Sequence, residues 1–422
     1  MNVKIKGNEV SGSVRAPPSK SYTQRAVACA LIADGRTEII DPSHCEDARA
    51  ALNAAKMLGA GVEEGYDKWV IEGGSLRTPE DIIDCKGSAT AIRIFTAVSA
   101  LAPGITVLTG DRSLRRRPMG ELLRCLNSLG VSCYSTRGDG CPPVVVMGGG
   151  IEGGEVNLRG DISSQFISAL LIASTKAKKD TVLNITTPIA SKYYVDMTME
   201  VLRAFGATIV REDRVFHIKG GQRLTPCNFR VEGDYSLGAI LLAAGLLAGN
   251  VGVEGLMPNS TQGDRKVIEI FSQMGGEVYM HGRTWRAKRS KLYGLVLDMS
   301  DVPDLVPITA VLGSQASGTT IIKGIRRLRF KESDRVLTTT NMLRAFGVEV
   351  KAYEDFMVIQ GGTPLRATVI DPSNDHRIAM ASAVASLVAQ GETIIQNAEC
   401  VSKSYPSFFN DLRTLGATVE VF

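Results

Sequence analysis

The sequence predicts an α/β protein built as a two-lobed inside-out α/β barrel, with six repeats of about seventy residues and three repeats in each lobe. Three observations predict it. Helix-like and strand-like segments alternate along the whole chain. An amphipathic helix pattern returns six times, and a wholly apolar helix pattern returns six times between its copies. With 44% hydrophobic residues among 422, the chain can bury a large core in each lobe.

The first pattern places apolar residues at helical spacing and then a glycine, where a left-handed C-cap is required. The copies read ALNAAKMLGAGV, LLRCLNSLGVSC, VLRAFGATIV, IEIFSQMGGEVYM, MLRAFGVEV and FFNDLRTLGATVEV. The glycines that end these helices are Gly59, Gly130, Gly206, Gly275, Gly347 and Gly416.

The second pattern opens with polar residues and then becomes small and apolar on every side, as in SKSYTQRAVACALIADG and NDHRIAMASAVASLVAQG. Such a helix is buried. Most copies precede a strand rich in Thr and β-branched residues, so each repeat should read strand, buried helix, strand, amphipathic helix, strand. Helices inside walls of sheet invert the usual barrel. A six-unit solenoid is the alternative, but the units lack its strict consensus. The segment RLTPCNFRVE, at 223–232, divides the two lobes most cleanly.

Charge and composition exclude several classes of protein. The net charge is only +4, which does not suit a nucleic-acid binder. The longest apolar run, 239–249, is too short to span a bilayer. Eight scattered cysteines without a CxxC pair or a signal peptide predict free thiols in the cytoplasm. Four histidines without ligand spacing predict no metal and no cofactor, so the expected partners are small molecules, with neither nucleic acid nor membrane among them.

Polar and charged residues gather where the predicted helices begin, which is where anions bind because of the helix dipole and free N–H groups. If the buried helices of a lobe are parallel, these groups converge on one face and suit ligands with phosphates and carboxylates. The alternatives are ordinary N-caps for the serines, a solvated face for RRRP, and a nucleic-acid patch for RRLRFKESDR. The residues concerned are Lys20, Ser21, Arg25, Thr90, Arg93, Arg115–Pro118, Ser163–Gln165, Ser191, Lys192, Asp304, Lys331–Arg335, His376, Arg377 and Lys403.

Eight motifs together resemble the 5-enolpyruvylshikimate-3-phosphate synthase family over essentially the whole chain. They are SKSYTQR (19–25), RRRPMG (115–120), DISSQF (161–166), SKYYVD (191–196), VPD (302–304), KESDR (331–335), NDHR (374–377) and SKSYP (402–406). The resemblance implies that residues 1–12 belong to the C-terminal lobe. The lobes are then 13–230, and 1–12 with 231–422, with the active site in the cleft between them and a monomer as the expected state.

The resemblance also implies the reaction, which is transfer of the enolpyruvyl group of phosphoenolpyruvate to the 5-hydroxyl of shikimate 3-phosphate with release of phosphate. It proceeds by addition and elimination through a tetrahedral intermediate, on the shikimate pathway to chorismate and aromatic amino acids. Carried over by motif, the residues for shikimate 3-phosphate are Lys20, Ser21, Arg25, Ser163, Ser164, Gln165, Ser191, Tyr194, Asp304 and Lys331. Those for phosphoenolpyruvate are Lys20, Ala89, Arg117, Gln165, Arg335, Arg377 and Lys403.

Addition of an alcohol to an enol ether requires a base at the oxygen and an acid at the terminal carbon. The resemblance assigns the base to Asp304 and the methylene proton to Glu332. Because nearby cations favour the ionised form of Glu332, Lys403 or Lys20 could share that role. The family's usual glycine before the helix is replaced by Ala89, an exchange that in the family accompanies tolerance of the competitor glyphosate. We therefore expect weak inhibition by glyphosate.

Single features of the sequence argue against three other functions. The related transferase that acts on UDP-N-acetylglucosamine uses a reactive cysteine near the position of Arg117, but here GDRSLRRRPMG has no cysteine, and the next one is Cys125. The related RNA-cyclase-like fold would carry a catalytic histidine signature, which is missing. A non-catalytic anion-binding module would not need Asp304 and Glu332 together with all the basic groups.

Overall fold

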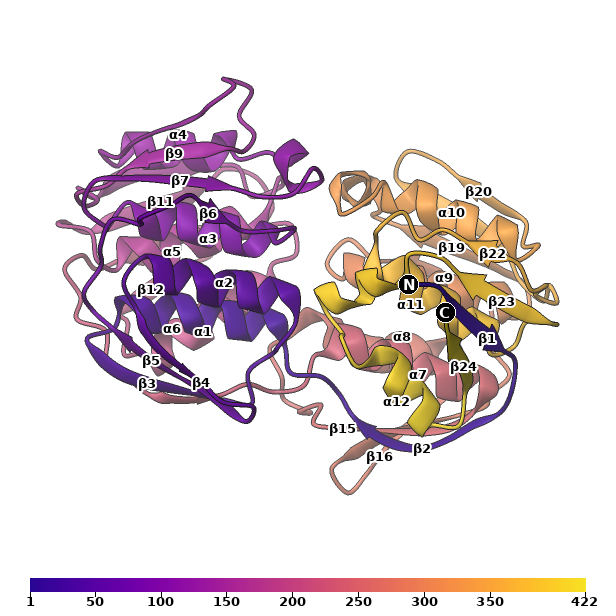
Figure 1. The fold of residues 1–422 in the computed structure, drawn as a ribbon. Helices are drawn as coiled ribbons and strands as arrows, with labels where there is room; N and C mark the ends of the chain where they lie inside the picture. Colours follow the sequence, from indigo (N-terminus) through magenta and orange to yellow (C-terminus); the bar gives the residue numbers. More distant parts are fainter. The chain divides into compact units, whose positions relative to one another are not determined.

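A computed structural model describes all 422 residues, and the chain forms two compact units (Figure 1). The N-terminal unit is Pro18–Val231, and the C-terminal unit is Met1–Pro17 together with Glu232–Phe422. Residues 13–17, predicted to belong to the N-terminal lobe, lie in the C-terminal unit. The reason is that strand β2 (Val10–Arg15) pairs in parallel with β15 (Gly249–Glu254) along its whole length.

Each unit contains three four-stranded sheets of one design. In the sheet of order β10-β11-β13-β12, the lead strand β10 (Gly154–Leu158) is parallel to β11 (Thr181–Ile185), which follows the inner helix. Two further strands, β12 (Ile209–Glu212) and β13 (Val215–Ile218), form an antiparallel hairpin that completes the sheet. The six repeats are thus confirmed, but the first five close with a hairpin and the sixth with one strand from each end of the chain, whereas the sequence pattern predicted a single closing strand.

The remaining elements follow the same order in every repeat. The N-terminal unit contains inner helices α1 (Lys20–Ile32), α3 (Ala89–Ser99) and α5 (Ser164–Ser174), outer helices α2 (Glu46–Met57), α4 (Gly120–Ser128) and α6 (Tyr193–Ala204), the 3₁₀ turn η1 (Leu114–Arg116), and strands β3 (Gly35–Ile40), β4 (Gly61–Glu64), β5 (Lys68–Gly73), β6 (Ile83–Asp84), β7 (Ile105–Thr109), β8 (Ser132–Ser135), β9 (Val144–Met147) and β14 (Asn228–Arg230).

The C-terminal unit contains inner helices α7 (Tyr235–Ala248), α9 (Val306–Gln315) and α11 (His376–Ser386), and outer helices α8 (Val267–Gln273), α10 (Arg335–Ala345) and α12 (Phe408–Thr414). Its 3₁₀ turns are η2 (Gly263–Lys266), η3 (Pro303–Leu305), η4 (Arg326–Phe330) and η5 (Ala398–Lys403). Its other strands are β1 (Val3–Lys6), β16 (Glu277–His281), β17 (Thr284–Lys288), β18 (Val296–Asp298), β19 (Thr319–Lys323), β20 (Val350–Ala352), β21 (Phe356–Gln360), β22 (Val369–Ile370), β23 (Glu392–Ile395) and β24 (Thr418–Val421).

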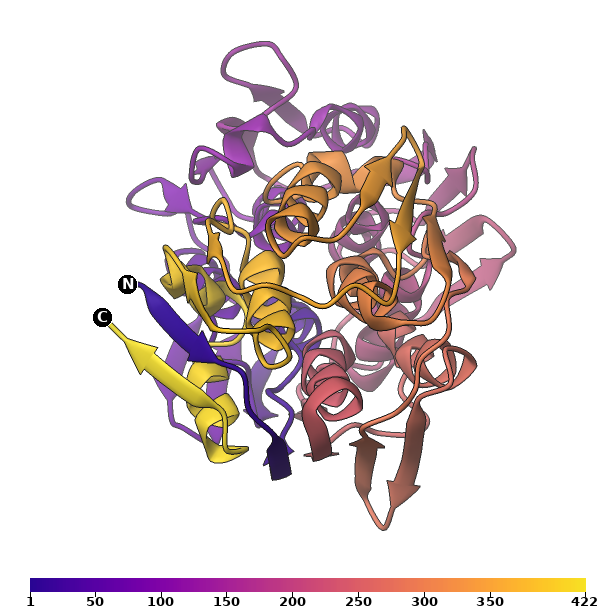
Figure 2. The same ribbon diagram turned by 90° about the vertical axis from the view of Figure 1, so that its right-hand side faces the viewer.

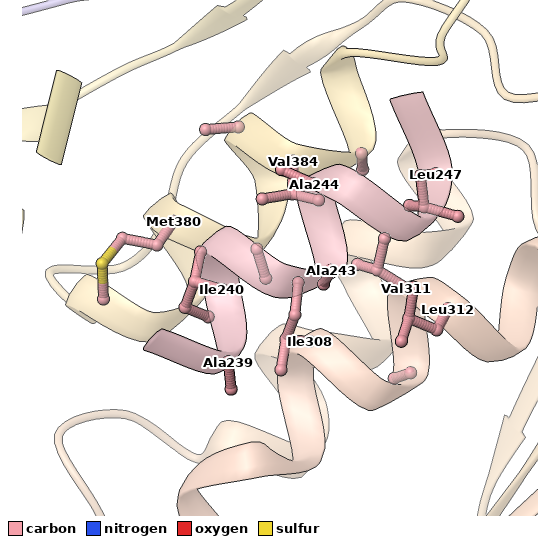
Figure 3. Close-up of a cluster of buried hydrophobic side chains, with 14 of the residues drawn as sticks. Ala239, Ile240, Ala243, Ala244, Leu247, Ile308, Val311, Leu312, Met380 and Val384 are labelled. Carbon is pink, nitrogen blue, oxygen red and sulfur yellow. The ribbon is translucent and has the colours of Figure 1, made fainter. Parts of the chain in front are cut away.

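The apolar helices form the interior of each unit, as predicted. Every residue of α7 is buried. Figure 3 shows Ile240 and Ala244 of α7 in one apolar cluster with Ile308 and Val311 of α9 and Val384 of α11. Small side chains on all faces let the three helices pack closely while the sheets cover them. Each unit has one continuous apolar core of this kind.

Two sets of glycines hold this layout. The six glycines predicted to end the amphipathic helices all have positive φ, between 76° at Gly206 and 113° at Gly59, so the left-handed C-caps are confirmed. A second set was not identified from the sequence. It lies at or just after the last hairpin strand, where the chain passes over the end of the inner helix. A Cβ on Gly148 would lie 1.9 Å from the Ala102 carbonyl oxygen, and one on Gly361 would lie 2.0 Å from that of Ala316.

The chain passes from one unit to the other twice, after β2 and after β14. Strand β2 precedes α1 in the chain but pairs with β15, whereas β14 precedes α7 but pairs with β3. The lead strands of the first and fourth repeats are therefore exchanged. The last repeat is closed by the beginning of the chain, because β1 lies between β23 and β24. The two chain ends consequently lie side by side, and the Asn2 amide donates to the Phe422 carbonyl at 2.8 Å (Figure 2).

Candidate active site

The inner helices begin differently in the two units. In the N-terminal unit a serine accepts a backbone N–H at each start, namely Ser19 for α1, Ser88 for α3 and Ser163 for α5. In the C-terminal unit Asp234 caps α7 and Asp375 caps α11 in the same way. Helix α9 has no side-chain cap and follows η3, which contains Asp304. A serine satisfies an N–H group without adding charge, whereas an aspartate also offsets the positive end of the helix.

Asp304 is the centre of the polar cluster in the C-terminal unit. Its Oδ1 accepts from Arg335 at 2.9 Å and from Lys331 at 3.4 Å, and its Oδ2 accepts from Arg377 at 3.1 Å. Burial alone would raise the pKa of Asp304, but the charges of Arg377, Lys331 and Arg335 hold it well below the ordinary value. Asp304 is therefore an ionised carboxylate surrounded by three cations.

Arg335 is almost fully buried and binds three carboxylates at once. Its Nε donates to Asp375 at 2.9 Å, and its other nitrogens donate to Asp304 and, at 2.6 Å, to Glu332. Burial would lower the pKa of Arg335, but these carboxylates raise it. The two residues assigned to proton transfer, Asp304 and Glu332, are thus joined by one guanidinium group.

Asp375 positions both arginines of this cluster. It is 0% exposed and accepts from Arg335, from the backbone N–H of Arg377 at 3.0 Å and from Ser333 Oγ at 3.0 Å. Two consecutive left-handed residues, Ser373 and Asn374, turn the chain immediately before it. The motif NDHR was identified in the sequence, but no role was predicted for Asp375. Its signal was the aspartate directly before an apolar helix.

Arg377 retains donors for a ligand. One nitrogen donates to Ser236 Oγ at 2.9 Å and to Asp304, while Nε and the other terminal nitrogen are buried without a hydrogen-bond partner. Burial opposes the charge of Arg377, but Asp304 raises its pKa above the ordinary value. Buried donors without acceptors are unfavourable, so this side of Arg377 suits a bound anion.

Arg93 is the corresponding feature of the N-terminal unit. It donates to Ser163 Oγ at 3.0 Å, to Gln165 Oε1 at 2.7 Å and to the Pro118 carbonyl at 3.1 Å, and no carboxylate contacts it. Burial, and then the charge of Arg117, lower the pKa of Arg93 to about 9. Gln165 is fixed on its other side because it donates to Thr90 at 2.9 Å. Arg93 was not assigned to a substrate from the sequence, although it was noted at a helix start.

Arg25 joins three helices of the same unit. It donates to Thr198 of α6 at 2.8 Å, to Ser168 of α5 at 3.3 Å and to the carbonyls of Ser21 and Tyr194, and it lies over the Tyr194 ring. Burial lowers the pKa of Arg25 to about 10. Most of its donors are therefore bound to the protein itself, so Arg25 positions Ser21 and Tyr194 as much as it is available to a ligand.

The remaining predicted residues lie at or near helix ends, and Arg117 and Lys403 lie at the C-terminal ends of 3₁₀ turns, where the sequence had predicted helix starts. Lys20 Nζ contacts Asp47 Oδ2 at 2.6 Å, and Asp47 Oδ1 is buried without a partner. Ser191 has a φ of 53°, a strained conformation of the kind found at functional sites. The other members, Ser164, Ala89 and Arg117, are buried. Lys403, at the end of η5, is also buried but forms no hydrogen bond or ion pair with the cluster around Asp304.

Comparison with known proteins decides the family. A sequence model of EPSP synthase (3-phosphoshikimate 1-carboxyvinyltransferase) matches residues 4–412. The chain belongs to the EPSP synthase family. Curated relatives named 3-phosphoshikimate 1-carboxyvinyltransferase include those of Halobacterium salinarum (42% identical), Methanocorpusculum labreanum (41%) and Methanococcus maripaludis (39%), each aligned over 100% of both chains.

Solved structures agree with this membership. EPSP synthase from Acinetobacter baumannii matches with a TM-score of 0.85 and 28% identity over 99% of both chains. The enolpyruvyl transferase NikO from Streptomyces tendae matches with a TM-score of 0.79 over 99% of this chain and 98% of its own, and at 18% identity it supports the fold alone. Membership of the EPSP synthase family confirms the resemblance found in the sequence and, with it, an enolpyruvyl transferase of the shikimate pathway. No helix of the structure has the length and apolar character needed to cross a membrane.

Proposed function

We propose that the two clusters divide the work of enolpyruvyl transfer from phosphoenolpyruvate to shikimate 3-phosphate. The C-terminal cluster supplies the base, Asp304, and cations for phosphoenolpyruvate. The N-terminal cluster supplies the hydroxyl, amide and guanidinium donors that hold shikimate 3-phosphate. The observation that carries this proposal is the environment of Asp304, an ionised carboxylate bound by the three cations Lys331, Arg335 and Arg377.

The same cations explain how Asp304 becomes a base. With its pKa held well below the ordinary value, Asp304 alone would be a poor proton acceptor. Phosphoenolpyruvate brings a carboxylate and a phosphate to Arg335 and Arg377, which then share their charge with the substrate. This raises the basicity of Asp304. Asp304 takes the proton of the 5-hydroxyl group while the hydroxyl oxygen forms a bond to the central carbon of phosphoenolpyruvate.

The methylene carbon of phosphoenolpyruvate must gain a proton in the same addition step. Glu332 is bound to Arg335 at 2.6 Å and has to leave that ion pair before it can donate a proton. Lys20, which contacts Asp47, and Lys403 are the other candidates for this role. In the elimination step the group that protonated the methylene carbon takes a proton back from the resulting methyl carbon, the C–O bond to the phosphate breaks, and the basic groups of both clusters stabilise the departing phosphate.

On the N-terminal unit, Ser163, Ser164, Gln165, Ser21, Ser191 and Tyr194 are proposed to bind shikimate 3-phosphate, with Arg25 positioning two of them. Arg117 and Gln165 are proposed to contact phosphoenolpyruvate as well. Arg93 is added to this set because it holds Ser163 and Gln165 in place and has no carboxylate partner. A dianionic phosphate would supply the missing negative charge.

The experiment that tests this proposal is phosphate release from purified protein given both substrates, with EDTA present. Release should require both substrates. Asp304→Asn should reduce kcat by about a hundred- to ten-thousandfold, the usual contribution of a general base. The matched control is Asp301→Asn, three residues earlier, because the side chain of Asp301 forms no hydrogen bond or ion pair. Full activity in Asp304→Asn would exclude Asp304 as the base. Absence of release by folded wild-type protein would redirect the assay to UDP-N-acetylglucosamine as acceptor.

Ala89 is proposed to face phosphoenolpyruvate at the first residue of α3, where it is 6% exposed. Its methyl group would then crowd a competitor that is larger than the substrate. The inhibition constant of glyphosate should fall in Ala89→Gly, and a constant that does not tighten would remove Ala89 from the pocket.

We also propose that the protein works as a cytoplasmic monomer. All eight cysteines are free thiols, and burial raises the pKa of Cys29, Cys85 and Cys400, as expected of structural thiols in a reducing compartment. Light scattering during size-exclusion chromatography should give a mass near 45.2 kDa. A mass of twice that value would contradict the monomer.

A further inference from the structure

A fifth carboxyl group lies beside the Asp304 cluster and is used by none of the steps above. Asp264, in η2, is only 8% exposed. Unlike the side chains of Asp234, Asp304 and Asp375, its carboxyl group forms no hydrogen bond and no ion pair within the protein. The turn that carries it is fixed, because the preceding residue Gln262 bonds the Tyr235 backbone N–H at 3.0 Å, Glu232 at 2.6 Å and the Gly233 carbonyl at 2.8 Å.

The position of Asp264 is set by α7. Both η2, which carries Asp264, and η3, which carries Asp304, pack against that helix. The charges that act on Asp264 come from four other elements: Asp304 of η3, Arg377 of α11, Asp234 at the start of α7 and Lys331 after η4. On its own segment and on α8, which also packs against η2, the charged residues Arg265, Lys266 and Glu269 are exposed. The charges that act on Asp264 thus belong to the Asp304 cluster, and the two turns share α7 as a packing partner.

The cluster already contains more carboxylates than cations. Asp234, Asp304, Glu332 and Asp375 stand against Lys331, Arg335 and Arg377, and a further ionised carboxylate without a donor is unfavourable. Burial, and then the charge of Asp304, raise the pKa of Asp264 to about 7. Asp264 thus changes its charge near neutral pH, whereas Asp304 remains ionised through that range.

We propose that Asp264 is a positioning residue that acts through Asp304, with the charge on its carboxyl group setting how strongly Asp304 holds the proton taken from the acceptor hydroxyl. This inference rests on the proposed role of Asp304. When Asp264 is neutral, the three cations outweigh burial and the charge of Glu332, and Asp304 is a weak base. When Asp264 ionises, repulsion between the two carboxylates strengthens Asp304 as a proton acceptor.

The first test compares the pH dependence of kcat/KM in wild type and in Asp264→Asn, which keeps the shape and removes the charge. The ratio of wild type to variant should be close to one at low pH and rise about threefold at high pH, with a midpoint near 7, because base catalysis follows basicity only in part. Ionisation of the substrates cancels in this ratio. Glu269→Gln, which removes a charge from the same segment at an exposed position, should give a flat ratio.

The second test measures stability and does not involve catalysis. Because the folded protein keeps the proton on Asp264 to higher pH than the unfolded chain does, wild type loses stability between about pH 4 and pH 7. Asp264→Asn lacks this loss. Its melting temperature relative to wild type should therefore rise between pH 5 and pH 8, and Glu269→Gln should show no such rise.

The outcomes separate the two proposals. A rising ratio together with the rise in melting temperature supports the role of Asp264. A change in stability with a flat kinetic ratio overturns it, because Asp264 would then titrate without acting on Asp304. Unchanged stability and a flat ratio overturn it as well. Asp264→Ser replaces Asp264→Asn if the amide variant does not fold. Full activity of Asp304→Asn would instead show that the proposed base is wrong.

Discussion

The two units share one design of sheets and helices, yet their inner helices begin on different chemistry. Serines cap all three in the N-terminal unit, while Asp234 and Asp375 cap two in the C-terminal unit and Asp304 precedes the third. Serine caps leave the positive ends of the helices available to anions, and aspartate caps offset them. One repeat architecture thus carries uncharged caps in one unit and carboxylates at the helix starts of the other.

The arginines follow the same division. Arg25 and Arg93 contact only neutral groups, and burial lowers the pKa of each, to about 10 and about 9. Arg335 and Arg377 contact carboxylates, which raise their pKa values despite burial. The first pair is held in place by the fold without a counter-charge, so a ligand must supply it. Carboxylates already offset the charge of the second pair, although two nitrogens of Arg377 still have no hydrogen-bond partner.

The largest effect expected from this contrast is on stability, in Arg335→Gln. The change leaves Asp304, Glu332 and Asp375 buried without their shared cation and should destabilise the protein by about 3–5 kcal/mol. Denaturant unfolding measures this. Arg344→Gln, on the exposed side of the same helix, is the control and should change little. A loss below 1 kcal/mol would mean that the three carboxylates do not depend on Arg335.

The opposite behaviour is expected of Arg93→Gln in the N-terminal unit. The variant removes a buried charge that no carboxylate balances, so stability should stay the same or rise. The KM for shikimate 3-phosphate should increase about ten- to a hundredfold, the value of one or two charged hydrogen bonds. Steady-state kinetics measures the change in KM, and a thermal melt measures the change in stability. Arg124→Gln on α4 removes an exposed arginine as the control, and a destabilised Arg93→Gln with normal KM would break the comparison.

The smallest effect comes from exchanging one type of cap for the other. Ser163→Asp places a carboxylate beside the Arg93 nitrogen that the serine oxygen now contacts at 3.0 Å. This should weaken shikimate 3-phosphate binding about fivefold through the helix dipole and the new ion pair, and should stabilise the protein slightly. Ser132→Asp, on the exposed strand β8, adds the same charge away from the site. If both variants bind equally well, the nature of the cap is not what distinguishes the units.

Local patterns were sufficient for much of the fold. The six C-cap glycines and six buried helices were predicted because the hydrophobic periodicity of a helix and its capping residues both lie within about a dozen consecutive residues. The second strand of each hairpin was missed because it is short. In β13 it is only the four residues VFHI, too few to show a reliable alternation in the sequence. The exchange of β2 and β14 could not be predicted from pattern, since each strand looks the same whichever unit it joins.

The same distinction between local and long-range signals applies to the residues of the site. Motifs gave Asp304, Arg335 and Arg377, and the structure brings them together. Asp375 and Arg93 were given no role because their partners are far along the chain: Arg335 is 40 residues from Asp375, and Arg93 is 70 from Ser163. Asp264 has no motif to mark it, and only its burial beside other carboxylates distinguishes it.

Because of the exchanged strands and the neighbouring chain ends, each unit of the protein could be encoded as one continuous segment of chain. Residues 18–231 are already continuous and contain three complete four-stranded sheets. A short linker from Phe422 to Met1 would make 232–422 and 1–17 continuous as well, again with three complete sheets. A circular permutant starting at Glu232 and ending at Val231 would retain every strand pairing of both halves while leaving a single covalent tether, at Pro17–Pro18, between them.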